Sequence, residues 1–140
     1  MKIYSLQDKI RLKIANIEIA VSPLNTLQKA EIQGLIMKSL KDPSNMLPSI
    51  QASCLCIKYG LKELKGAKMA DGSPFELQFE DGKLTDDCVE MLNNSQLSVK
   101  LHQTCFNLLN GIPTVWTDEH GEELKGVEVV KTRTKKKMKK

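Results

Sequence analysis

Apolar and polar residues alternate along the N-terminal segment 9–22 in two phases. The apolar positions are Ile10, Leu12 and Ile14, followed by Ile17, Ile19 and Val21. The phase changes at Ala15-Asn16, which predicts two short strands joined by a two-residue turn in which Asn16 tolerates a positive φ. A single bulged strand is the alternative.

The next segments have the spacing of amphipathic helices. The first helix is expected at about 26–40, with Asn25 or Thr26 as its cap and with Gln28, three residues after Asn25, in a capping-box pattern. The second is expected at about 49–64, with Gly66 as its C-cap. Its apolar seam consists of Ile50, Cys54, Ile57, Leu61 and Leu64. A short third helix follows Thr85, and a fourth runs through Leu97, Leu101, Cys105 and Leu108 to Asn110-Gly111.

Strand patterns return in the second half of the chain. Phe75, Leu77 and Phe79 alternate with polar residues, which predicts a half-buried central strand that ends at Asp81-Gly82. Residues 112–130 read as two strands joined around His120-Gly121. The sum is one α+β domain over residues 1–130, with about four helices and four or five short antiparallel strands.

Basic residues are concentrated at the C-terminus. Seven of the 21 Lys and Arg residues lie among the last ten, so the other 14 face 17 acidic residues and residues 1–130 carry about −3. The seven are Lys131, Arg133, Lys135, Lys136, Lys137, Lys139 and Lys140. We expect residues 131–140 to form a disordered tail. The alternatives are a salt-dependent polyanion contact through these seven side chains, or lysine codons on which a ribosome slips.

Composition narrows the class of protein. Aromatic residues make up 4% of the chain, which argues against a surface that stacks single-stranded bases. The sequence has no apolar stretch of the length that a signal peptide or membrane span needs, so we expect a cytoplasmic protein. In that compartment the four cysteines are expected to be reduced thiols that fill the core.

Candidate chemical groups are few, and each has a simpler structural explanation. Cys54 and Cys56 are too close for a zinc pair and point apart on a helix. His102 and Cys105 lack a visible orienting group, and His120 falls in a turn. Asp86 and Asp87, followed by Glu90, suit the first turn of a helix. We predict no catalytic residue, cofactor or metal, and the default class is an interaction protein. Methionines adapt to varied partners, although core filling is their commoner use.

Two stretches resemble the tail assembly chaperones of long-tailed bacteriophages. The first is Ser22-Pro23-Leu24-Asn25-Thr26 leading into Lys29-Ala30-Glu31-Ile32, and the second comprises Asp71-Gly72-Ser73-Pro74-Phe75-Glu76-Leu77, Asp81-Gly82 and Leu84-Thr85-Asp86-Asp87-Cys88. A small body with a lysine-rich end also fits this family. The chain departs from it in its several strands, because related chaperones are often largely helical.

This resemblance implies a non-enzymatic protein of the host bacterial cytoplasm. It would bind the tape measure protein, keep it soluble while tail tube protein assembles around it, and be absent from the virion. A −1 frameshift within the codons for Lys135 to Lys140 would make a longer form that recruits tube subunits. We expect a groove between the first two helices to cover the client's apolar stripe.

Two other classes remain open. One is a small nucleic-acid-associated regulator that acts through the basic tail, since nucleic acid is an unlikely partner for the body. The other is a structural component of the virion, in the tail or the head-to-tail connector.

Overall fold

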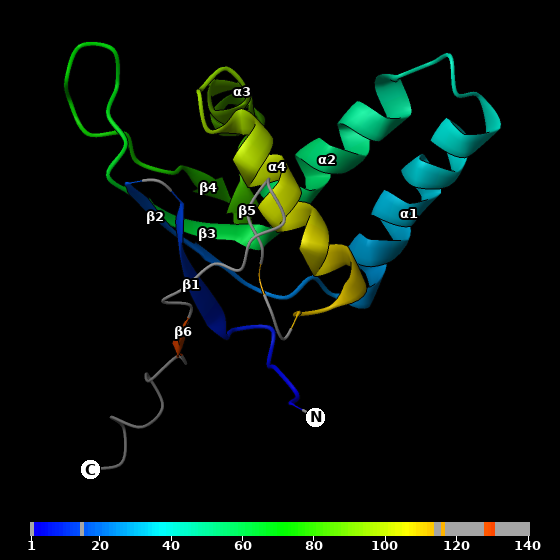
Figure 1. Cartoon of the computed structure of the whole chain (residues 1–140), viewed down its shortest axis with the longest axis horizontal. Coiled ribbons are helices and arrows are strands. Elements are labelled where there is room, and N and C mark those ends of the chain that lie inside the picture. Colours follow the sequence, from blue (N-terminus) through cyan, green and yellow to red (C-terminus); the bar gives the residue numbers. More distant parts are fainter. Residues whose placement is uncertain (1, 15, 114–115, 117–127, 131–140) are drawn as a thin grey trace.

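The computed structural model describes residues 2–14, 16–113, 116 and 128–130, and it is an α+β domain, as predicted. Its helices gather on one side of the larger sheet, and the α1–α2 hairpin projects from the body (Figure 1). The strands are β1 (Lys9–Ile14), β2 (Ile17–Val21), β3 (Leu61–Lys65), β4 (Phe79–Glu80), β5 (Lys83–Leu84) and β6 (Glu128–Val130). The helices are α1 (Thr26–Lys41), α2 (Leu47–Gly60), α3 (Asp86–Asn93) and α4 (Ser98–Phe106), followed by the 3₁₀ turn η1 (Asn107–Asn110).

The N-terminal hairpin is confirmed. β1 and β2 are antiparallel, with Ile14 opposite Ile17 and Ile10 opposite Val21. The alternating apolar side chains face the core, since Ile10, Leu12, Ile19 and Val21 are all buried. The pairing of Ile14 with Ile17 leaves two residues for the connection, as predicted.

The predicted helix starts are also confirmed. Asn25 Oδ1 accepts the backbone N–H of Gln28 at 2.8 Å, and Gln28 Oε1 accepts the N–H of Asn25 at 3.0 Å, a complete capping box. Thr85 Oγ1 accepts the N–H of Cys88 at 3.2 Å and starts α3. These side chains satisfy donors that a helix leaves unpaired at its first turn.

The second helix ends earlier than predicted. The prediction ran too far because a β-bulge in the strand that follows gives its apolar residues a helical spacing. α2 ends at Gly60, and residues 61–65 form β3 beside β2. Lys62 is the extra residue of the bulge, so Leu61 and Leu64 both face the core although they are three positions apart. That spacing imitates a helix. Gly66 is therefore not a helix cap; it follows β3 with a φ of 101°.

The buried face of α2 also differs from the predicted seam. Ile57 is buried, but Ile50 is exposed and Cys54 is half-buried. The helix instead packs through small residues spaced four apart, namely Ala52, Cys56 and Gly60. A β-carbon at Gly60 would overlap with Cδ1 of the buried Leu108. α2 therefore lies close against α4 and η1.

The central strand is shorter than the predicted run. Only Phe79 and Glu80 are in strand conformation, and they pair with Lys83 and Leu84. Asp81 and Gly82 have positive φ of 56° and 80°, which is the geometry of a two-residue hairpin turn. The sequence did not predict this hairpin, because its second strand has two residues, of which only Leu84 is buried. Two residues are too few to show an alternation of apolar and polar positions.

Part of the predicted C-terminal hairpin lies outside the described residues, as do its turn at His120-Gly121 and the tail 131–140. β6 is described, and it extends the sheet order to β3-β2-β1-β6 by pairing with β1. Val130 lies opposite Lys9. Trp116 is buried in the core.

Two helical glycines provide a matched test of the close contact. Gly60→Ala should lower the free energy of unfolding by about 1 kcal/mol or more, since overpacking at Leu108 outweighs the gain in helix propensity. Gly34→Ala, on α1, should raise it by about 0.5–1 kcal/mol, because nothing lies within 4 Å of its new β-carbon. Urea denaturation of both variants measures the difference, and equal shifts would contradict this packing.

Candidate functional site

The cysteine pair on α2 occupies the core. Cys56 is buried and Cys54 is half-buried, and the Cys54 sulfur accepts a hydrogen bond from Asn93 Nδ2 at 3.3 Å. Burial raises the pKa of the Cys56 thiol to about 12. All four cysteines are free thiols. Among the described residues, no group of three or more His, Cys, Asp or Glu side chains is placed to hold a metal ion.

His102 pairs with Asn93. Its Nε2 lies 2.8 Å from Asn93 Oδ1, while Nδ1 is buried without a hydrogen-bond partner within the described ranges. Burial lowers the pKa of the imidazole, because a proton on Nδ1 would have no acceptor. Cys105 is fully buried, and burial followed by the nearby Cys56 raises its pKa. His102 and Cys54 thus share Asn93 as a hydrogen-bond partner, and the raised pKa of Cys105 is the opposite of what an activated thiol needs.

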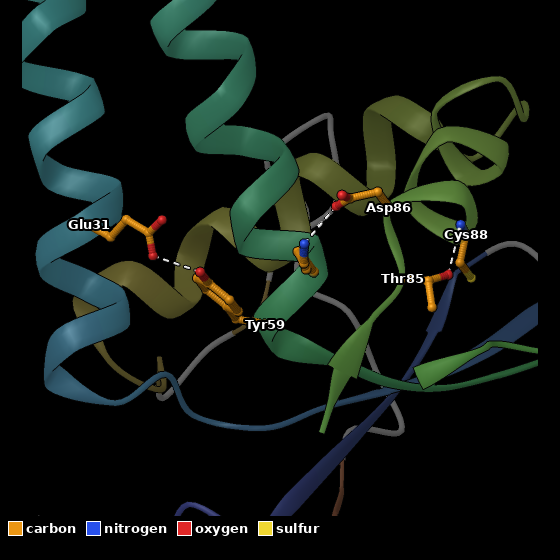
Figure 2. A network of polar contacts seen from close by, with 6 residues as sticks. Glu31, Tyr59, Thr85, Asp86 and Cys88 are labelled. Atoms are coloured by element: carbon orange, nitrogen blue, oxygen red, sulfur yellow. Dashed lines mark hydrogen bonds and ion pairs between the residues drawn. The ribbon is translucent and has the colours of Figure 1, made fainter. Parts of the chain in front are cut away.

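The acidic residues at the start of α3 have separate surroundings. Asp86 Oδ1 lies 2.6 Å from Lys58 Nζ, which ties α3 to α2 (Figure 2). This hydrogen bond, and then the charge of Lys58, lowers the pKa of Asp86. Asp87 lines a cavity together with Met91, and Asp86 does not line it. The two acids therefore do not converge on one point.

Exposed apolar side chains gather at the far end of the α1–α2 hairpin, and we call this set the hairpin end. Its members are Met37, Leu40, Met46, Leu47 and Ile50, which are between 51% and 68% exposed. They occupy the last turn of α1, the connection and the first turn of α2. Large exposed apolar patches often mark interaction sites, which makes the hairpin end a candidate binding surface.

The methionines were expected mainly as core filler, and that expectation is wrong for all four described ones. Met37, Met46, Met69 and Met91 are each at least 38% exposed. Their flexible thioethers can adapt to partner surfaces of different shape. Five exposed large apolar residues of the hairpin lie at its end, while Leu27, which is 81% exposed, lies in the first turn of α1.

The sequence pattern assigned Ile50 to the apolar seam of the second helix and overlooked Leu47. A usable signal was present, because Met46-Leu47 is an apolar pair directly after the turn Asp42-Pro43-Ser44. Apolar residues on both sides of a turn that projects from the body cannot reach the core.

One polar contact fixes the base of the hairpin. The Tyr59 hydroxyl, near the end of α2, donates to Glu31 Oε1 on α1 at 2.6 Å (Figure 2). Burial raises the pKa of Tyr59 to about 12, assisted by this hydrogen bond and by the charge of Glu31. α1 has only one buried residue, Ile32, so this bond supplements a small apolar contact.

The outer face of the sheet carries charges that partly neutralise one another. Lys9 Nζ lies 3.0 Å and Arg11 Nη2 lies 3.3 Å from the Glu63 carboxylate. The Lys9 hydrogen bond is the largest cause that lowers the pKa of Glu63. Burial, and then the charge of Lys9, lowers the pKa of Lys62. The body therefore has some cationic surface, which the net charge alone did not reveal.

Searches of family models, curated proteins and solved structures found no match to this chain. In the described segments, no helix combines the length and the apolar character needed to cross a bilayer.

The Glu31–Tyr59 contact yields a pH prediction. Because the folded pKa of Tyr59 lies above its ordinary value of 10.0, the linked stabilisation is complete below that pH and is lost as the pH rises through about 12. Glu31→Gln removes the charge and should lower the pKa of Tyr59 without restoring 10.0, since burial is the larger cause. Ultraviolet titration in a Tyr4→Phe background isolates Tyr59. An unchanged pKa in Glu31→Gln would show that the contact is absent.

Proposed function

We propose that this protein is a non-enzymatic tail assembly chaperone of a long-tailed bacteriophage, which binds the tape measure protein in the host bacterial cytoplasm. The observation that supports this proposal is the hairpin end, with its five exposed apolar side chains. The resemblance in the segments at 22–32 and 71–88 supplies the identity of the client, and the surface supplies a place to bind it.

The physical basis is the coverage of an apolar stripe. A long amphipathic helix exposes apolar residues at intervals of three to four, and these aggregate in water. The hairpin end offers a comparable apolar surface with Lys38 and Lys41 beside it. Each contact is weak, but many copies along one rod would keep the rod dispersed until tail tube protein replaces them.

The proposed role assigns folding stability to the body and client binding to the hairpin. The sheet and α2–α4 provide the core, while α1 contributes one buried residue to it. Substitutions at the hairpin end should therefore alter binding with little effect on folding. This separation makes the proposal testable by mutation.

The first experiment uses co-expression with the tape measure protein of the genome that encodes this chain. The double variant Leu40→Asp/Leu47→Asp should weaken binding by about tenfold or more, because each lost apolar contact is worth about 1.5–3 kcal/mol. Soluble tape measure protein in the lysate, and calorimetry with a purified fragment, measure the loss.

The matched control is Val99→Asp on α4, which places the same charge at an apolar residue that is 71% exposed and is not a member of the hairpin end. It should bind like the parent chain. Equal loss in both variants, or no tape measure gene in the genome, would contradict the proposal.

The tail distinguishes the alternatives. A chain that lacks residues 131–140 should still keep the client soluble. A nucleic-acid-associated regulator would instead lose its binding to nucleic acid on this deletion, and its affinity for nucleic acid would fall steeply with salt.

Mass spectrometry tests for the frameshifted longer form. Presence of this chain in purified virions would favour a structural component.

A further inference from the structure

A cavity of about 290 Å³ lies between the 68–75 loop and α3, away from the hairpin end. Figure 1 shows this green loop and the α1–α2 hairpin on opposite sides of the body. Its apolar wall includes Met69, Phe75, Cys88 and Met91, while Glu76 and Asp87 contribute carboxylates. The volume is at the lower end of the range for ligand pockets, enough for about one or two large side chains.

The loop that forms one wall is internally hydrogen bonded. Met69 N–H donates to the Ser73 carbonyl at 2.7 Å, and Phe75 N–H donates to the Ala67 carbonyl at 3.1 Å. Asp71 accepts from the backbone and hydroxyl of Ser73 at 3.0 and 2.6 Å. The wall is therefore largely formed before a partner arrives, which lowers the ordering cost of binding.

The segment around the cavity is strongly acidic. Residues 68–92 contain seven Asp and Glu residues and two bases, Lys68 and Lys83, whereas the whole chain is +4. Asp86 is paired with Lys58. Across the described residues, Glu76, Asp87 and Glu90 take part in no ion pair. Negative charge near the cavity is thus largely uncompensated.

We propose that this cavity binds a basic amphipathic helix of another protein, with an apolar side chain inserted between Met69 and Met91 and with Lys or Arg residues beside Glu76 and Asp87. Both features of the site are used by this partner: the methionine wall takes the apolar side chain, and the carboxylates attract its cations. Nucleic acid and acidic peptides are repelled by the same carboxylates. The inference goes beyond the chaperone role and does not depend on it.

Methionine methyl NMR on the full chain tests the site directly. The probe is a synthetic amphipathic helix of Lys, Ala and Leu, and the signals are assigned with single Met→Leu variants. The methyl signals of Met69 and Met91 should shift on titration, while those of Met37 and Met46 should stay in place. A matched peptide with Glu in place of Lys should leave the Met69 and Met91 signals in place. Shifts at Met37 and Met46 alone with the Lys peptide, or equal shifts of Met69 and Met91 with the Glu peptide, would overturn the proposal.

Charge reversal provides the second test. Glu76→Lys/Asp87→Lys should weaken peptide binding by about tenfold or more at low salt. The control Glu18→Lys/Asp42→Lys makes the same change in net charge at exposed positions outside the cavity, and it should cause a smaller loss. Equal losses of affinity in the two variants would show that only the net charge of the protein matters, and this would overturn the proposed site.

The chain's own residues 131–140 are the competing occupant, because they are basic and contain Met138. If a chain without these residues binds the probe about tenfold more tightly, the cavity serves the tail rather than a separate partner, and the proposal fails. Unchanged affinity supports it. Because the methyl signals separate the cavity from the hairpin end, failure here leaves the chaperone proposal standing.

Discussion

The close approach of α2 to α4 and η1 is the contact on which the rest of the fold depends. Ala52, Cys56 and Gly60 leave room for larger side chains from the other elements, and Leu108 fills the space at Gly60. α2 also contacts α1, α3, β3 and β5. Interiors are packed at crystal-like density, so a larger residue at this face would displace several elements at once. The same packing buries Cys56 and Cys105 side by side, where burial keeps both thiols protonated.

This central position of α2 explains why the hairpin end is open. The inward face of α2 is occupied by α4 and η1, so α1 can pack only along its flank. α1 has sixteen residues and buries only Ile32 fully, with Leu35 and Ile36 half-buried. Its last turn extends past the body and leaves Met37 and Leu40 in solvent. The apolar residues of the hairpin exceed what one flank of α2 can cover, and the excess forms the proposed binding surface.

Local signals in the sequence were sufficient for the elements they control. The change of alternation at residues 15–16 predicted the β1–β2 hairpin, and the Asn25 and Thr85 caps predicted the starts of α1 and α3. β3 could not be predicted in this way, because the bulge at Lys62 places Leu61 and Leu64 on one face with helical spacing. The candidate site was only partly predictable. An apolar residue on a helix, such as Leu40 or Ile50, is exposed or buried according to tertiary packing that its periodicity does not encode.

The two exposed apolar regions differ in the charge around them, and this difference bears on how they could act together. The hairpin end has Lys38 and Lys41 nearby, whereas the cavity beside α3 is flanked by Glu76 and Asp87. A partner complementary to one region is electrostatically mismatched to the other, which gives selectivity without shape discrimination. The α1–α2 hairpin and the loop before β4 lie on opposite sides of the domain (Figure 1), so occupation of one region leaves the other accessible. A protein arranged in this way can hold an apolar helix at the hairpin end while a basic segment of a second protein binds beside α3. Such dual binding suits a factor that brings two assembly partners together, because the contact between them then becomes effectively intramolecular.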